Sequence, residues 1–132
     1  MMKRGHAWLC CGPAIFCLLD GVLTLHGQPH PYWEGLLDRG VEWNTPFLLL
    51  LRLHPLGFSV GVLAWLLLAS SLIFWLPGGL ARGLSFMVQF AHTLGAASWL
   101  LQANELGLLA AVALIAFSRL VMDVSWGQSS VP

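Results

Sequence analysis

The sequence predicts an all-α, polytopic membrane protein with four transmembrane helices and one short interfacial or re-entrant helix. Of its 132 residues, 58% are hydrophobic and only 9% are charged, whereas a typical soluble domain has roughly 25% charged residues. The mean hydropathy is +0.77, and the apolar residues gather in runs of about 20, the length of a helix that crosses a bilayer. Six basic and six acidic residues give a net charge of zero. No basic stripe is present, so we expect no nucleic-acid partner.

Four apolar runs define the predicted spans of a single bundle domain, residues 1–132, and they lie at about 7–27, 56–76, 80–101 and 106–124. Pro77, Gly78 and Gly79 predict a tight turn between the second and third spans. Residues 102–105 join the third and fourth spans, and Asn104 is predicted to cap the fourth helix. Because both connections are short, the last three spans should be antiparallel neighbours.

The polar segment between the first two spans contains the predicted short helix. Its prolines at 29 and 31 exclude a continuous helix there. Asn44 or Thr45 can cap a helix over 46–53, and Pro46 suits its first position. Such a helix is too short to span a bilayer. The seven residues from Trp126 are predicted to form a loose tail.

Basic residues predict the orientation and the location of the chain. Lys3 and Arg4 precede the first span, and Arg82 follows the second. The positive-inside rule therefore places both termini in the cytoplasm, with residues 28–55 and the 102–105 turn outside. Asp20 interrupts the first apolar run, so we expect this helix to remain as an uncleaved span rather than a signal peptide. We expect an integral protein of a bacterial inner membrane.

Tryptophans mark the predicted ends of the spans, as expected of interfacial anchors. Trp65 is the exception, since it falls in the middle of the second span. The cysteines contain no C-x-x-C pair, so we expect inert thiols rather than redox chemistry; they are Cys10, Cys11 and Cys17.

Small residues recur at a spacing of four, in Gly57 with Gly61 and in Ala91 with Gly95. Such pairs allow helices to approach closely in lipid. They predict packing within the bundle or, alternatively, a face for a partner. Besides the lipid bilayer, the expected partners are another membrane protein or further copies of this chain.

Two ionisable residues lie deep in the predicted spans, where a charge costs roughly 2.5–3.5 kcal/mol. Asp20 and His92 fall at similar depths of the first and third helices, which predicts a hydrogen bond between them. Thr24 shares the helix face of Asp20, and Gln89 shares the face of His92.

Further polar residues are predicted near the outer end of the same region and complete a candidate polar cluster: His26, Glu42, Asn44 and His54. Glu42, Asn44 and His54 are placed to fold back over the Asp20 face. Three interpretations are open: a structural pair that fixes helix register, a proton or ion relay, and a divalent metal site. Imidazole and carboxylate suit several metals, but no tight ligand spacing is present.

Part of this pattern resembles small bacterial and archaeal four-helix membrane families of unknown function. Those families carry an Asp in the first helix and a Glu-x-Asn-Pro motif before the second. Here the corresponding residues are Asp20 with Thr24, and Glu42-x-Asn44 followed by Thr45 and Pro46. The resemblance covers the first third of the chain and implies a polar cluster of Asp20, Glu42 and Asn44.

The expected function is that of an accessory or assembly subunit, or a small transport component, with an outward-facing polar cluster inside the membrane. The first alternative is a metal-dependent membrane enzyme that uses Asp20, Glu42, His54 and His92. The second is a haem- or pigment-binding subunit, since His92 stands among small residues that leave room for a flat macrocycle.

Overall fold

All regular secondary structure of the described residues is helical. The computed structural model describes residues 3–103 and 105–129. Its elements in chain order are α1 (Lys3–His26), α2 (His30–Trp33), the 3-10 turn η1 (Leu37–Arg39), α3 (Thr45–Leu53), α4 (Pro55–Trp75), α5 (Gly78–Ala103) and α6 (Gly107–Ser129).

Four of these helices are long and apolar enough to cross a membrane, and they cover Gly5–His26, Pro55–Trp75, Gly78–Ala103 and Gly107–Ser129. They confirm the predicted four-helix fold and identify the chain as a multi-pass integral membrane protein. Helix α3 confirms the short fifth helix. The prediction did not include α2 and η1, where Pro29 precedes the first helical turn and Pro31 lies within it.

The predicted end of the last helix was wrong, because α6 continues to Ser129 instead of stopping near Val124. The last turns of α6 are helical and pack against the rest of the bundle. Ser125 is buried, and Gly5 lies so close to Ser129 that a Cβ atom on it would meet the Ser129 carbonyl oxygen at 2.9 Å. The beginning of α1 therefore lies beside the end of α6. The predicted cap at Asn104 lies outside the described residues.

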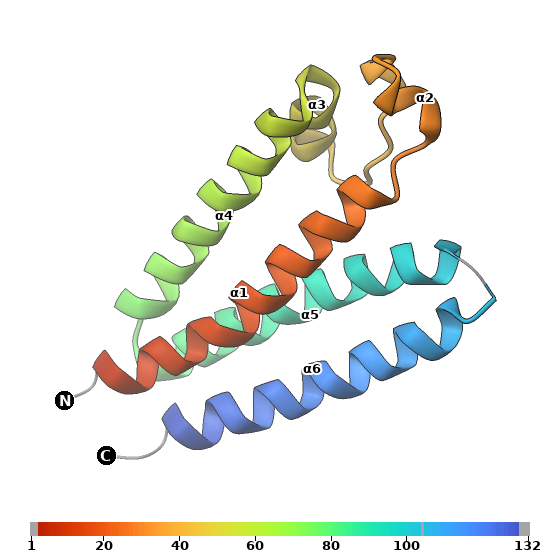
Figure 1. The fold of residues 1–132 in the computed structure, drawn as a ribbon. Coiled ribbons are helices and arrows are strands. Elements are labelled where there is room, and N and C mark those ends of the chain that lie inside the picture. The colour runs from red at the N-terminus through yellow and green to blue at the C-terminus, as the bar shows by residue number, and fades with distance from the viewer. Residues whose placement is uncertain (1–2, 104, 130–132) are drawn as a thin grey trace.

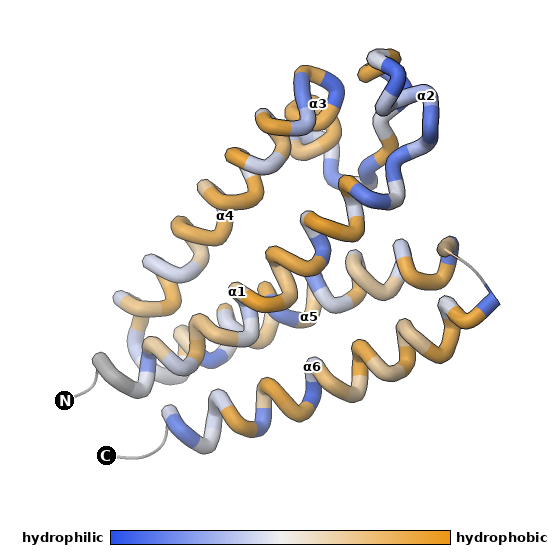
Figure 2. The backbone as a smooth tube through the Cα atoms, viewed as in Figure 1, coloured by the Kyte–Doolittle hydropathy of each residue, from blue (hydrophilic) through white to orange (hydrophobic). Residues whose placement is uncertain are grey.

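Helices α1 and α5 each contact all three other long helices of the bundle. Helices α4 and α5 meet near their shared turn and diverge toward the opposite end, where α2 and α3 lie (Figure 1). Hydropathy follows this arrangement, since hydrophilic residues gather around α2 and the segment after it while α4 and α6 are largely hydrophobic (Figure 2). Side chains of α1, α4 and α5 line a cavity in this part of the bundle.

Hydrogen bonds fix the segment between α1 and α3 (residues 27–44, the connecting segment). The Gln28 amide donates to the carbonyls of Thr24 at 2.7 Å and Val41 at 2.9 Å, and its oxygen accepts from the Val41 N–H at 2.8 Å. The buried Tyr32 hydroxyl donates to the Leu51 carbonyl at 3.0 Å. Burial raises the pKa of Tyr32 above its usual value, so the hydroxyl remains a donor. These bonds hold the connecting segment against the end of α1.

A second buried network joins α5 to α6. The Gln89 amide donates to the Ser118 carbonyl at 2.7 Å and to its hydroxyl at 3.0 Å, and Thr93 and Ser118 hydroxyls lie 2.9 Å apart. Gly12 of α1 lies directly against the Gln89 amide. Interhelical hydrogen bonds of this kind hold helices together in lipid, where hydrophobic burial contributes little.

Candidate functional site

The predicted pair between α1 and α5 is present. Asp20 Oδ2 lies 2.8 Å from His92 Nδ1, and the two side chains are 20% and 19% exposed. Gly95, one turn after His92, makes this approach feasible because a Cβ atom there would lie 2.6–2.9 Å from the Asp20 carboxyl atoms. The small residue on α5 therefore admits the carboxylate, and the carboxylate joins the two helices.

Trp65 extends this pair to α4. Its indole Nε1–H donates to His92 Nε2 at 3.0 Å. An indole nitrogen only donates, so Nε2 must offer its lone pair and Nδ1 must carry the proton. In this arrangement His92 donates Nδ1–H to Asp20, and Nε2 carries no proton while it accepts the indole N–H. The three residues form a chain of hydrogen bonds from indole to imidazole to carboxylate, which we call the Asp20–His92–Trp65 chain.

While Trp65 donates to His92 Nε2, an ionised Asp20 has no positive partner in these hydrogen bonds, whereas a proton on Nε2 would make the Asp20–His92 contact an ion pair. A lone charge in a membrane interior is costly and is relieved by a proton, an ion pair or water. A second proton on His92 Nε2 would also require the Trp65 N–H to move away. Proton binding and the position of Trp65 are thus linked.

A cavity of about 330 Å³ lies between α1, α4 and α5, beside the Asp20–His92–Trp65 chain of hydrogen bonds. The end of the connecting segment and the beginning of α3 contribute further lining residues. It is lined by Cys17, Asp20, Gly21, Thr24, Glu42, Trp43, Asn44, Phe47, Phe58, Val62, Trp65, Ala91, His92 and Gly95. We call it the Asp20 cavity. The intramembrane pair is thereby connected to a segment that lies outside the spans.

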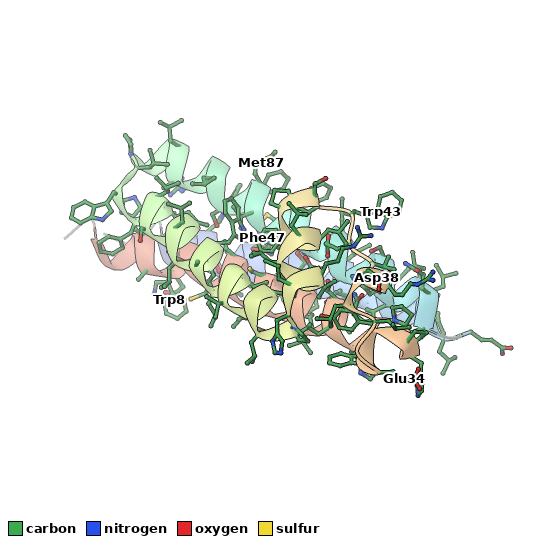
Figure 3. All side chains as sticks on the ribbon, turned by 90° about the horizontal axis from the view of Figure 1, so that it is seen from above. Trp8, Glu34, Asp38, Trp43, Phe47 and Met87 are labelled. Carbon is green, nitrogen blue, oxygen red and sulfur yellow. The ribbon has the colours of Figure 1, made fainter. Side chains whose placement is uncertain are left out.

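Glu42 and Asn44 lie at the connecting-segment end of the cavity, as the sequence indicated. Glu42 Oε1 accepts the Asn44 backbone N–H at 2.9 Å, which fixes the local turn before α3. In the view from above, Phe47 lies over the middle of the bundle and Trp43 at its edge (Figure 3). Trp43 is 89% exposed, although it also lines the cavity.

The structure brings together five of the eight residues predicted for the polar cluster, namely Asp20, Thr24, Glu42, Asn44 and His92. The other three lie elsewhere. Gln89 is buried in the α5–α6 network, and His26 is exposed at the end of α1. His54 is exposed and caps α4, where its Nδ1 accepts the Leu56 N–H at 3.1 Å.

Sequence reasoning did not assign Trp65 and Cys17 to this site. A signal for Trp65 was available, because it alone departed from the interfacial positions of the other tryptophans. Its mid-helix place corresponds to a hydrogen bond with His92. Cys17 lies one turn before Asp20 on the same face of α1, but nothing in its pattern distinguished it from an ordinary buried thiol.

The contacts of His54 and His92 bear on the two cofactor alternatives. Within residues 3–103 and 105–129, no three His, Cys, Asp or Glu side chains are grouped so that they could hold a metal ion. His54, one of the four proposed metal ligands, is engaged in capping α4. Both ring nitrogens of His92 have hydrogen-bond partners, so an axial haem ligand would first have to lose Trp65.

The small-residue pairs serve contacts within the chain. A Cβ atom on Gly57 would meet the Leu50 carbonyl at 3.4 Å, and one on Gly61 would overlap the Leu50 side chain. Both glycines therefore pack α4 against α3. Gly95 faces Asp20, and Ala91 lines the cavity. The alternative use of these residues as a partner face stays a prediction.

Comparisons with family models, with curated proteins and with solved structures found no match to this chain. The resemblance to four-helix families of unknown function therefore remains an expectation from the sequence, and the site is interpreted from its geometry.

Replacing Trp65 with Phe tests the assigned His92 tautomer. The ring volume is nearly kept, but Nε2 loses its donor, so we expect a mixture of tautomers and a loss of about 0.6–1.7 kcal/mol in unfolding free energy. Side-chain nitrogen-15 NMR of His92 measures this directly. The wild type should show an unprotonated Nε2 and a protonated Nδ1, and the same spectrum in the variant would contradict the role given to Trp65.

Proposed function

We propose that the chain is a small transport component of its membrane, in which the Asp20–His92 pair binds and releases a proton through the Asp20 cavity. The observation that supports this most is the position of the pair, which lines a cavity at membrane depth instead of being sealed between helices. A pair that only fixed helix register would gain nothing from a cavity.

The arrangement of charges is suited to a single exchangeable proton. The titratable groups that line the cavity are Asp20 and Cys17 from α1, His92 from α5 and Glu42 from the connecting segment, whereas α4 contributes Phe58, Val62 and Trp65. With His92 neutral and held by Trp65, one added proton neutralises the carboxylate–imidazole pair. Its release restores the negative charge, which is costly in lipid and so favours rebinding of a cation.

A path for the proton leads toward the connecting segment. Asp20 lies six residues before the end of α1, a rise of about 9 Å, and Glu42 lines the cavity from beyond the span. Glu42 is therefore the group that would pass protons between water and the pair. By the distribution of basic residues, this end faces the outside of a bacterial inner membrane and both termini face the cytoplasm.

A chain of this size is expected to work with other subunits. Only 22% of the apolar stretch of α4 and 28% of that of α6 are buried within the bundle, so their outer faces contact lipid, a membrane partner or another copy of the chain. A role as an accessory or assembly subunit would use the same faces without proton movement.

Proton flux into proteoliposomes tests the proposal. Purified protein is reconstituted with an internal pH-sensitive dye, and flux is driven by a potassium diffusion potential. We expect flux above that of empty vesicles for the wild type and a fall to the empty-vesicle level for Asp20→Asn, which keeps the shape of the side chain but removes its charge.

Asp123→Asn is the matched control. It makes the same chemical change at a carboxylate on α6 that is paired with Arg119 at 3.0 Å and lies outside the cavity. Its flux should equal that of the wild type. Equal flux from wild-type and Asp20→Asn vesicles, or none from wild type, would contradict the proposal; absence of flux with a co-purifying membrane partner would favour the accessory role.

A further inference from the structure

We infer that the Asp20 cavity binds a small organic cation, an ammonium group with an apolar body, in competition with the proton. This inference deepens the proposed function, on which it rests, by naming the class of ligand that the same site would carry. It follows from three properties of the cavity: its charge, its walls and its size.

The charge of the cavity is negative. Among the described residues that line it, two are carboxylates, Asp20 and Glu42, and none is Lys or Arg. While Nε2 of His92 accepts the indole N–H of Trp65, the imidazole adds no positive charge to the cavity. A ligand that carries one positive charge would therefore offset the intramembrane carboxylate, and an anion would be repelled by both carboxylates.

Four of the fourteen residues that line the cavity are aromatic. Trp43, Phe47, Phe58 and Trp65 all line it, with Val62 between the last two on α4. Aromatic ring faces attract an ammonium group and also pack against an apolar body. A metal ion or a hydrated alkali cation would make little use of four aromatic side chains, since hard cations prefer oxygen ligands.

The size of the cavity favours a small ligand. Its volume of about 330 Å³ is at the lower end of the roughly 300–1,000 Å³ typical of small-molecule sites. Gly21, Ala91 and Gly95 add no large side chains to the lining. A single aromatic ring with an ammonium head matches such a space better than an extended lipid-like chain.

Competition with the proton follows from the shared charge. Protonation neutralises the Asp20–His92 pair, and the bound ammonium group would then lose its counter-ion. Asp20, His92, Cys17 and Glu42 are the titratable groups that face this position. Cation binding should accordingly weaken as the pH is lowered and should release a proton from the pair, as exchange of one cation for another requires.

Equilibrium dialysis of the protein in lipid nanodiscs tests the inference with labelled phenyltrimethylammonium as the probe. We expect saturable binding to one site per chain, displaced by the unlabelled cation. Benzenesulfonate, the anionic counterpart, and tert-butylbenzene, the neutral isostere, should not displace it. Displacement by the neutral isostere as effective as by the cation would show an apolar site only and would overturn the inference.

Variants locate the site. Asp20→Asn and Glu42→Gln should each weaken binding by roughly tenfold, equivalent to about 1.4 kcal/mol, and Trp65→Phe should weaken it less because an aromatic face remains. Trp8→Phe is the matched control, since Trp8 is an exposed tryptophan of α1 outside the cavity. Unchanged affinity in Asp20→Asn and Glu42→Gln would overturn the inference. If one of these variants folds poorly, unchanged affinity in the other is enough to overturn it.

The two proposals fail separately. Proton flux without saturable cation binding would contradict the ligand assignment and leave the proton-binding function standing. Cation binding that is independent of pH, with no flux, would contradict the proton function and the competition while retaining the aromatic, acidic site.

Discussion

Gly95→Ala is expected to lower the free energy of unfolding by about 1–3 kcal/mol, although it adds only one methyl group. The new Cβ atom would lie 2.6–2.9 Å from the carboxyl atoms of Asp20, well inside van der Waals contact. Asp20 has a short side chain that is held by His92 at 2.8 Å. The carboxylate must therefore move away from the imidazole, and the pair between α1 and α5 is weakened or lost.

The matched control lies on the same helix. Nothing is within 4 Å of a Cβ atom built on Gly83, so Gly83→Ala should gain about 0.5–1 kcal/mol from the higher helix propensity of alanine. Reversible unfolding of both variants in mixed detergent measures the two changes, and the His92 nitrogen-15 shifts report whether the pair is disturbed. A Gly95→Ala protein as stable as Gly83→Ala would show that the Asp20 carboxylate is not confined as described.

The part of the site that could be predicted from the sequence is the part that depends on depth along a helix. Asp20 and His92 have similar positions within their spans, and the cost of a charge in lipid requires a partner for each; the structure places them 2.8 Å apart. Glu42 and Asn44 were expected to fold back over this face, and both line the cavity. Linear position and the cost of burial were sufficient for these residues.

The remaining assignments depended on the rotation of each helix, which sequence position does not determine. Gln89 shares the face of His92 to within one turn, but the helix directs it toward Ser118 of α6 instead of the cavity. His54 was expected to turn toward Asp20. The break between α3 and α4 instead leaves the Leu56 N–H without a partner inside the helix, and the His54 ring accepts it. Trp65 reaches His92 because α4 and α5 come close enough for a hydrogen bond at that level.

The helix ends show the same limit. The spans were predicted within a few residues, because hydrophobic length is set by the bilayer. The error at the end of α6 arose because Trp126 and the small polar residues after it have no strong helical pattern of their own. Contact between Gly5 and Ser129 stabilises this last turn, and such a contact between the two ends of the chain is not visible in the local sequence.

The second large effect is expected at the α1–α5–α6 contact. A Cβ atom on Gly12 would overlap the amide of Gln89, whose nitrogen donates to Ser118 at 2.7 and 3.0 Å. Gly12→Ala should therefore cost about 1–3 kcal/mol by forcing this amide from its partners. Gln89→Ala should be destabilising as well, because it removes the hydrogen bonds to Ser118 and leaves a cavity.

The double variant Gly12→Ala/Gln89→Ala separates steric conflict from general damage. With the amide absent, the methyl group at position 12 has room and partly fills the space. The double variant should therefore lose less unfolding free energy than the two single variants lose in sum, by roughly 0.5–3 kcal/mol. Gly127, beside which a Cβ atom would meet nothing within 4 Å, provides the control: Gly127→Ala combined with Gln89→Ala should be additive. If the losses in unfolding free energy of Gly12→Ala and Gln89→Ala also add up in the double variant, α1 does not contact the Gln89 amide as described. A clear coupling energy would instead show that Gly12 sets the distance between α1 and α5. Asp20 lies two turns further along α1, so the same distance allows its contact with His92.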